Sequence, residues 1–356
     1  MSGSIGQRKA DHLALCATED VGFRQASTLF GNVRLVHDAL PDLDARTIDT
    51  SLTLLGKKLR APIVIAAMTG GTEEAGAINR ELASIAEERG LGFGLGSQRA
   101  MLVREGSAPT YRVRDVAPTT LVLGNIGVVQ ARDMPTEQVR ALVGEVGADA
   151  LCVHLNPAME LVQAGGDRDF SRGLDTIARL VAELNVPVVV KETGCGLWPE
   201  VARRLRNVSV QHLDVSGAGG TSWVGVETKR AAIAEDEPSR ALGETFWDWG
   251  IPTAVSVALI APLGFRTVLA TGGIQSGLDV AKAIALGANA AGVARGLLQA
   301  LHHGGRPRAL AFVDSLEREL RAAMLLTGSR DLRALVRAPR VVVGELALWI
   351  EQLSHR

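Results

Sequence analysis

Eight short apolar segments of the sequence each end in a group of polar, charged or glycine residues, and helix-like stretches separate most of them. The segments are residues 62–71, 92–99, 119–127, 150–156, 186–194, 210–221, 267–273 and 290–296. Eight such repeats are typical of an α/β protein with a (β/α)8 TIM barrel. In that fold the active site lies at the C-terminal ends of the strands, which is where these polar groups stand. The pattern therefore predicts both the architecture and the position of the chemistry.

Composition excludes several other classes of protein. The chain has 356 residues, of which 47% are hydrophobic and 22% charged, as in a soluble globular protein. Its formal net charge of −1 gives no overall field that would attract nucleic acid or a membrane surface. The N-terminus has no apolar signal region, and no segment approaches the roughly 20 apolar residues of a membrane span. We therefore expect a cytoplasmic protein with no nucleic-acid partner.

The whole chain, residues 1–356, is expected to form one domain, and the segments outside the predicted strands belong to it. Residues 1–61 precede the first strand and are expected to form an arm or cap. Apolar spacing predicts helices, which are residues 73–89, 136–146, 174–184 and 278–286. Gly90 and Gly287 supply stop signals after the first and last of these. Residues 307–356 are expected to form a C-terminal helical extension, with one final helix packed against the barrel.

Two glycine-rich turns predict an anion site. Residues 270–277 lead from the seventh strand into a helix, and residues 293–296 follow the eighth strand. Backbone N–H groups of such turns and a helix N-terminus favour an anion, and many barrels bind a phosphate at this place. The alternative is that Gly272, Gly273 and Gly277 only make tight turns. A third glycine-rich segment, residues 217–223, lets a ligand approach the backbone closely.

Other strand ends carry groups suited to catalysis or charge. Lys191 ends the fifth strand and can face a cofactor or serve as a Schiff base. His154 and Asn156 alternate at the end of the fourth strand and so point the same way. Glu160 can hold Mg²⁺ through its carboxylate, although a lone carboxylate is usually a solvated surface group. Arg99 and the pair Arg8–Lys9 are positive charges near otherwise uncharged loops; taken singly, each is most often a surface residue.

Taken together, the motifs resemble those of the type 2, flavin-dependent isopentenyl diphosphate isomerase family over nearly the whole chain. The matching motifs are Arg8, Lys9 and His12, MTGG at Met68–Gly71, GSQR at Gly96–Arg99, NIG at Asn125–Gly127, HLN at His154–Asn156, KETG at Lys191–Gly194, GGTSW at Gly219–Trp223, WGIPT at Trp249–Thr253 and TGG at Thr271–Gly273. Several long motifs in one order make a specific match.

The resemblance implies interconversion of isopentenyl and dimethylallyl diphosphates by a homo-oligomer, a tetramer or octamer. It implies FMN, Mg²⁺, and NADPH as the reductant that primes the flavin. The implied FMN contacts are Met68, Thr69, Ser97, Asn125, Lys191, Ser216, Thr221, Gly272, Gly273, Ala294 and Arg295. The implied substrate contacts are Arg8, Lys9, His12, Ser97, Arg99, His154 and Asn156. Glu160 is the implied metal ligand, and His154, Lys191 and Met159 occupy the implied catalytic positions.

One of these positions departs from the family pattern. The family has glutamine immediately before the metal-binding glutamate, whereas this chain has Met159. Methionine is similar in length, but it cannot donate a hydrogen bond and accepts one only weakly. Nearby, the family's PEGD is AGGD at Ala164–Asp167, and Trp198 stands where serine is usual. Three alternatives therefore stay open: an FMN enzyme with an altered prenyl diphosphate or alkene substrate, a flavin-binding protein without catalysis, and an unrelated flavin oxidase of the same fold.

Overall fold

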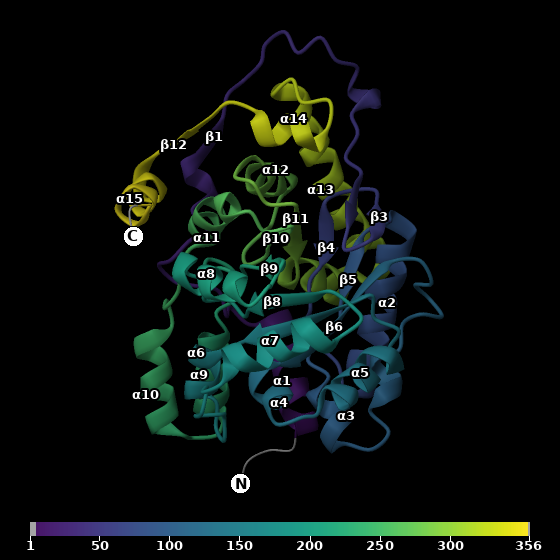
Figure 1. Ribbon diagram of the computed structural model, residues 1–356, viewed down its shortest axis with the longest axis vertical. Helices are drawn as coiled ribbons and strands as arrows, with labels where there is room; N and C mark the ends of the chain where they lie inside the picture. The colour runs from purple at the N-terminus through teal and green to yellow at the C-terminus, as the bar shows by residue number, and fades with distance from the viewer. Residues whose placement is uncertain (1–4, 355–356) are drawn as a thin grey trace.

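A computed structural model describes residues 5–354 and shows a closed barrel of eight parallel strands (Figure 1). The strands neighbour one another in the order β10-β11-β4-β5-β6-β7-β8-β9. Their bounds are β4 Ile63–Ile65, β5 Gly92–Gly94, β6 Leu121–Gly127, β7 Ala150–Leu155, β8 Val188–Glu192, β9 His212–Asp214, β10 Thr267–Ala270 and β11 Ala290–Val293. Each strand lies within the apolar segment that predicts it, and the barrel prediction is confirmed.

The inside of the barrel is plugged at its N-terminal end. Inward-facing strand residues such as Val64, Leu121 and Val189 form one buried cluster with Leu54 and Leu59. These two leucines come from an antiparallel hairpin, β2 Leu52–Leu54 and β3 Lys57–Leu59. Alternate strand residues face outward into the main core beneath the helices. Because the hairpin fills one end, space for a ligand remains only towards the C-terminal ends of the strands.

Helices surround the barrel at the predicted places. Their bounds are α2 Glu73–Arg89, α3 Arg99–Val103, α4 Val128–Arg132, α5 Thr136–Glu145, α6 Pro157–Val162, α7 Gly173–Glu183, α8 Pro199–Asn207, α9 Trp223–Ile233, α10 Glu237–Phe246, α11 Thr253–Ile260 and α12 Gly277–Ala285. Short 3₁₀ turns are η1 Phe30–Asn32, η2 Ala45–Thr47, η3 Ala108–Tyr111 and η4 Ala261–Leu263. The α2 helix matches its prediction at both ends, since Thr72 caps its start and Gly90 ends it at φ 63°. The predicted ends of α5, α7 and α12 are each within one residue.

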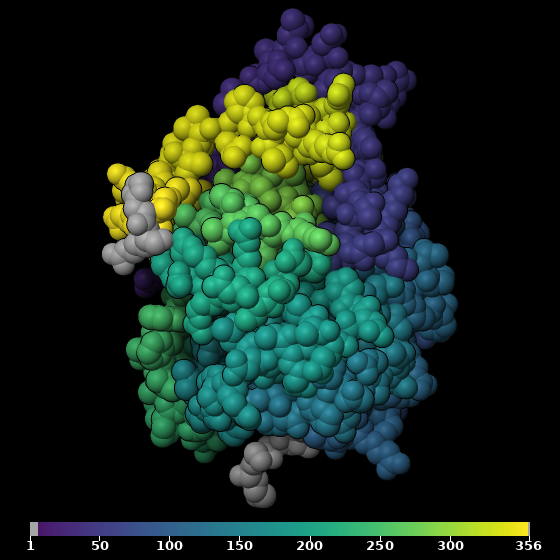
Figure 2. Space-filling view, in the orientation of Figure 1, coloured from purple at the N-terminus to yellow at the C-terminus, as the bar shows by residue number. Residues whose placement is uncertain are grey.

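The C-terminal region differs from the prediction of one final helix. It forms α13 Arg295–Leu326, α14 Leu332–Arg337, β12 Arg340–Val342 and α15 Gly344–Leu353. The helix α13 is broken at Gly304 and Gly305, whose backbone angles are not helical. The strand β12 pairs antiparallel with β1 Val33–Leu35 of the N-terminal arm. A partner strand far away in sequence thus overrides the local helical pattern. The part of the arm that includes β1 lies with the C-terminal extension at one end of the molecule (Figure 2).

The first described residues of the arm form a helix, α1 Ile5–Thr18, that covers the opposite, C-terminal end of the barrel. Leu13, Leu15 and Cys16 of α1 pack against Val226 of α9 and Leu298 of α13. This places Arg8, Lys9 and His12 over the strand ends. Within residues 5–354, no helix combines the length and apolar character needed to cross a membrane.

Candidate active site

A cavity of about 660 Å³ lies between α1 and the C-terminal ends of the barrel strands. This volume is within the range of about 300–1,000 Å³ that is usual for small-molecule and cofactor sites. Gly277 of the predicted anion turn does not line this cavity and packs against Leu316 instead. All of the residues implied for FMN, substrate, metal and catalysis do lie on its wall: Arg8, Lys9, His12, Met68, Thr69, Ser97, Arg99, Asn125, His154, Asn156, Met159, Glu160, Lys191, Ser216, Thr221, Gly272, Gly273, Ala294 and Arg295. The fold therefore brings residues that lie far apart in the sequence, from Arg8 to Arg295, to one site.

One end of the cavity is a cradle of glycine backbone. The glycine loop, residues 219–221, follows β9 and touches the turn after β10. A Cβ atom on Gly220 would lie 2.4 Å from the backbone nitrogen of Gly273, and one on Gly272 would lie 2.1 Å from the oxygen of Gly217. Gly272 and Gly273 also have φ of 99° and 77°, which side-chain-bearing residues rarely adopt. These glycines therefore allow the two loops to approach closely and leave their backbone accessible to a ligand.

Two polar atoms on the cavity wall are buried without a partner among the described residues. They are Thr69 Oγ1 and Arg295 Nε. A buried polar group without a hydrogen bond costs about 1–3 kcal/mol. A polar ligand that reached both atoms would remove that cost.

Lys191 lies at the end of β8 as a buried hydrogen-bond donor. Its Nζ atom donates to the carbonyl oxygen of Glu192 at 2.7 Å and lies 3.5 Å from Asp214 Oδ2. Asp214 in turn accepts a 2.6 Å hydrogen bond from Thr271 Oγ1 through its other oxygen. The ammonium group is thereby fixed in direction at the base of the cavity. This arrangement favours a contact to a cofactor over the alternative of a Schiff base.

The other end of the cavity carries three positive charges. Arg8 and Lys9 come from α1, and Arg99 begins α3. Burial, together with the charge of Arg99, lowers the pKa of Arg8. Burial and the charges of Arg8 and Arg99 lower the pKa of Lys9 to about 8. Arg99 lies 3.6 Å from a carboxylate oxygen of Asp167. Cations crowded in this way are stabilised by a ligand with several negative charges.

His154 faces this cationic end as a neutral ring. Its Nδ1 atom lies 2.8 Å from Asn125 Oδ1, and the Asn125 amide nitrogen donates to the oxygen of Leu95 at 3.0 Å. Because an amide oxygen only accepts, we assign the proton to Nδ1, which leaves Nε2 as an acceptor. Burial lowers the pKa of His154 to about 3, and the charges of Lys191, Lys9 and Arg99 add to the shift.

Glu160 is held in one orientation on α6. Asn156 Nδ2 donates to its Oε1 at 2.9 Å, while Gln163 Nε2 at 3.1 Å and the backbone N–H of Asp167 at 2.8 Å donate to its Oε2. A carboxylate has about four acceptor directions, so about one remains for a metal. Among residues 5–354, no group of three or more His, Cys, Asp or Glu side chains could hold a metal. Mg²⁺ suits this arrangement, since it commonly takes one or two carboxylates and completes its shell with substrate phosphates and water.

Comparison with known proteins places the chain in a family. A model of the FMN-dependent dehydrogenase family matches residues 2–154 and 155–341. The isopentenyl-diphosphate delta-isomerase of Methanothermobacter thermautotrophicus is 43% identical over 349 residues, covering 98% of this chain and 96% of the relative. That of Nostoc sp. is 45% identical over 303 residues, covering 84% of this chain and 85% of the relative. The chain belongs to the type 2 isopentenyl diphosphate isomerase family. The resemblance drawn from the motifs is confirmed.

Solved structures similar to this one support the fold alone. A mandelate oxidase variant with (S)-mandelic acid has a TM-score of 0.65 at 17% identity, with 95% of this chain and 96% of that chain covered. A second one, with a monooxide FMN adduct, has a TM-score of 0.64 at 18% identity, with 92% and 95% covered. At these identities the likeness shows a shared barrel and says nothing of a shared substrate.

The family residues carry contacts that sequence reasoning missed. His12 lies on the cavity wall, but its Nε2 atom is 2.5 Å from Glu227 Oε1, and Glu227 also pairs with Arg230 at 2.7 Å. Burial alone would raise the pKa of Glu227, but the hydrogen bond with His12 and the charge of Arg230 outweigh it and lower that pKa. Arg230 reaches Asp11 of α1 as well, at 3.1 Å. This network fastens α1 over the site.

Gln130 and Gln163 also line the cavity and are absent from the motif-based set. Gln130 donates to Asp167 at 2.7 Å, so it supports the carboxylate that lies beside Arg99. Gln163 lies on the same segment as Glu160, four residues after Met159. This position is the sequence signal by which it could have been found. No sequence signal joined Glu227 to His12, because 215 residues separate them.

Proposed function

We propose that the protein interconverts isopentenyl and dimethylallyl diphosphates. The observation that carries this proposal is the division of one cavity into two ends that suit different anions. The glycine cradle suits the phosphate of a nucleotide-type cofactor, and the cationic end with Glu160 suits a diphosphate with Mg²⁺. The family membership supports the same assignment.

FMN is the cofactor that the cradle would accept. The backbone of Gly272 and Gly273, after the seventh barrel strand, and Arg295, after the eighth, would hold its phosphate, as is common in this fold. Thr69, Asn125 and Lys191 would hold the ring. When bound and reduced, by NADPH in this proposal, the flavin supplies an electron-rich surface and a proton-handling group for an allylic rearrangement without net redox change.

The protein's own contribution is binding and orientation. Arg8, Lys9 and Arg99 neutralise the diphosphate, and arginine offers it a two-pronged donor. Glu160 would hold Mg²⁺ against the same diphosphate. With the charged head fixed, the short apolar tail would extend towards Met159 and the ring site, so that few orientations would be available at the reacting carbons. The helix α1 covers the site and would shield it from water.

Met159 favours a second candidate, a family enzyme with an altered prenyl diphosphate or alkene substrate. Its side chain lies on the cavity wall beside Glu160. A thioether there is more apolar than the family glutamine and gives an alkene no hydrogen bond. The diphosphate end is the same in both candidates, so they differ only in which hydrocarbon tail reacts.

A direct assay separates these functions. The purified protein is loaded with FMN, reduced under anaerobic conditions, and given isopentenyl diphosphate with Mg²⁺, while dimethylallyl diphosphate is followed by NMR. We expect interconversion, dependent on reduced FMN and Mg²⁺. Failure with isopentenyl diphosphate but turnover of another prenyl diphosphate would favour the second candidate. Turnover of mandelate by the oxidised protein would indicate a flavin oxidase, and FMN binding without any turnover would indicate a non-catalytic protein. Light scattering of the same sample tests the expected tetramer or octamer.

A further inference from the structure

The segment that follows α1 forms one wall of the glycine cradle. We call residues 20–28 the arm segment. The backbone N–H of Phe23 donates to the oxygen of Gly220 at 3.1 Å, and Gly22 pairs with Thr221 as an antiparallel bridge. A Cβ atom on Gly219 would lie 2.1 Å from the backbone nitrogen of Thr28. The shape of the glycine loop therefore depends on the arm segment staying in place.

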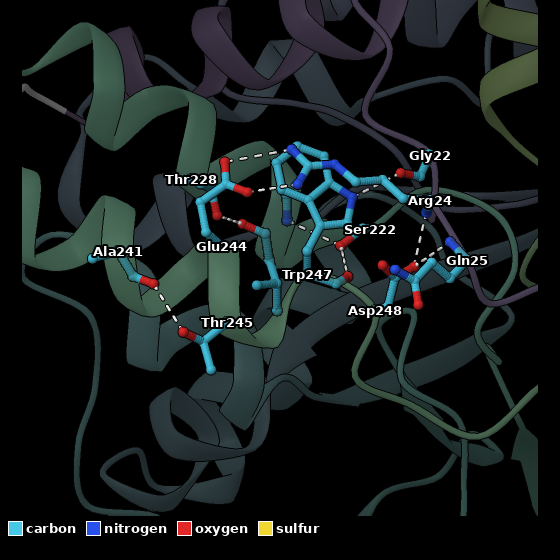
Figure 3. Close-up of polar contacts among 12 residues, drawn as sticks. Gly22, Arg24, Gln25, Ser222, Thr228, Ala241, Glu244, Thr245, Trp247 and Asp248 are labelled. Atoms are coloured by element: carbon cyan, nitrogen blue, oxygen red, sulfur yellow. Dashed lines mark hydrogen bonds and ion pairs between the residues drawn. The ribbon is translucent and has the colours of Figure 1, made fainter.

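The arm segment has no helix or strand of its own, and two residues between α10 and α11 hold it (Figure 3). One carboxylate oxygen of Asp248 accepts the backbone N–H groups of residues 24–26, at 2.8, 3.0 and 3.3 Å. The indole Nε1 of Trp247 donates to the oxygen of Gly22 at 2.9 Å. A carboxylate that accepts several backbone N–H groups fixes the local backbone, because each bond to a charged group is strong.

Trp247 also holds the glycine loop from its other side. Its backbone oxygen accepts a 2.7 Å hydrogen bond from Ser222 Oγ, the residue after the loop. Its ring lies against Gly225, where a Cβ atom would be 2.6 Å from the ring. Only 3% of Trp247 is exposed. One side chain thus contacts both the arm segment and the start of α9, and fixes the distance between them.

Neither Trp247 nor Asp248 lines the cavity, whereas Gly22, Phe23 and Gly220 do. We propose that Trp247 and Asp248 are positioning residues for the cofactor phosphate: they hold the arm segment against the glycine loop, so that the cradle keeps the shape that accepts FMN. This inference rests on the proposed use of FMN.

The test is the affinity of the apoprotein for FMN, measured by quenching of flavin fluorescence. Asp248→Ala removes the acceptor of three backbone N–H groups, and we expect roughly tenfold weaker FMN binding. Trp247→Phe keeps a ring but loses the donor to Gly22, and we expect a loss of several-fold. The KM for isopentenyl diphosphate at saturating FMN should stay within about twofold, because the cationic end is untouched.

Two variants distinguish positioning from general support of the fold. Asp248→Asn keeps an acceptor oxygen and should restore most of the FMN affinity. Glu244→Gln breaks the exposed 2.5 Å ion pair between Glu244 and Arg24, on the same segment, and should leave FMN affinity unchanged. Wild-type FMN affinity in both Asp248→Ala and Trp247→Phe would overturn the inference. Wild-type protein that takes up no FMN would instead overturn the proposed function.

Discussion

At the scale of single residues, two basic groups at the cationic end of the cavity hold a proton more weakly than usual in the free protein. Lys9 has its pKa lowered to about 8, first by burial and then by its arginine neighbours, and His154 has its pKa lowered to about 3. Both groups are therefore more easily neutral than usual. A diphosphate would favour their protonated forms, so ligand binding and proton binding are coupled at this end.

We predict that diphosphate binding takes up protons and weakens at alkaline pH. The free protein loses the Lys9 proton as pH rises through about 8, whereas the complex keeps it because the bound anion raises that pKa. Affinity should therefore fall above about pH 8, by up to about tenfold per pH unit. Calorimetric titration with inorganic diphosphate and Mg²⁺, in two buffers of different ionisation enthalpy, measures the uptake. Lys9→Met should abolish the alkaline fall, and an affinity that stays constant to about pH 10 would contradict the prediction.

We predict that Met159→Gln raises turnover of isopentenyl diphosphate. If the glutamine of relatives only orients the substrate, the gain reflects one neutral hydrogen bond of about 0.5–1.5 kcal/mol, hence at most roughly tenfold in rate. If it relays protons, the gain is far larger, because a thioether relays none. The kcat at saturating FMN and Mg²⁺ distinguishes these cases. Met159→Leu, which keeps an apolar side chain, is the matched control. A lower kcat in Met159→Gln would mean that this site has adapted to methionine.

At the scale of elements, the sequence predicts what is local and misses what is distant. The ends of α2 follow from Thr72 and Gly90, and the barrel strands follow from buried apolar segments. The strand β12 could not be predicted, because its partner β1 lies about 300 residues earlier and only the fold brings them together. In the same way the motifs identify Lys9 and His12, but the helix α1 and the Glu227 contact that hold them over the site are tertiary features.

The turn after β10 gives an element-scale prediction: Gly272→Ala should weaken FMN binding strongly. A Cβ atom there would lie 2.1 Å from the Gly217 oxygen, and the φ of 99° is strained for alanine. The backbone must shift at the point where the two cradle loops meet, so we expect FMN affinity to fall at least roughly tenfold. Gly144→Ala on α5 is the control, since nothing beyond its neighbours and the backbone of its own helix lies within 4 Å of its Cβ position. It should keep FMN affinity and unfold at an equal or higher temperature.

At the scale of the whole molecule, different parts of the chain build the two ends of the cavity. The cradle comes from the arm segment and the loops after β9, β10 and β11, whereas the cationic end comes from α1 and the loops after β5 and β7. Both ends lie at the C-terminal rim of the barrel, whereas the N-terminal end of the barrel is filled by packed apolar side chains. Changes at Gly272 in the cradle and at Arg99 in the cationic end should have nearly independent effects, because Gly272 packs against Gly217 whereas Arg99 lies beside Asp167, and changes at sites without shared partners usually add.

This independence predicts that a change at one end affects the thermal stabilisation by that end's ligand and leaves the stabilisation by the other ligand intact. The Tm of the wild-type protein should rise with FMN alone, and it should also rise with inorganic diphosphate and Mg²⁺ added together. A ligand at about 100 times its Kd stabilises the folded state by about 2.7 kcal/mol. Arg99→Ala should lose most of the diphosphate shift and keep the FMN shift, since it removes a charged hydrogen bond worth about 1.5–3 kcal/mol. Gly272→Ala should show the reverse. If either variant loses both shifts, the two ends form one coupled site and their separate assignment to FMN and diphosphate is wrong.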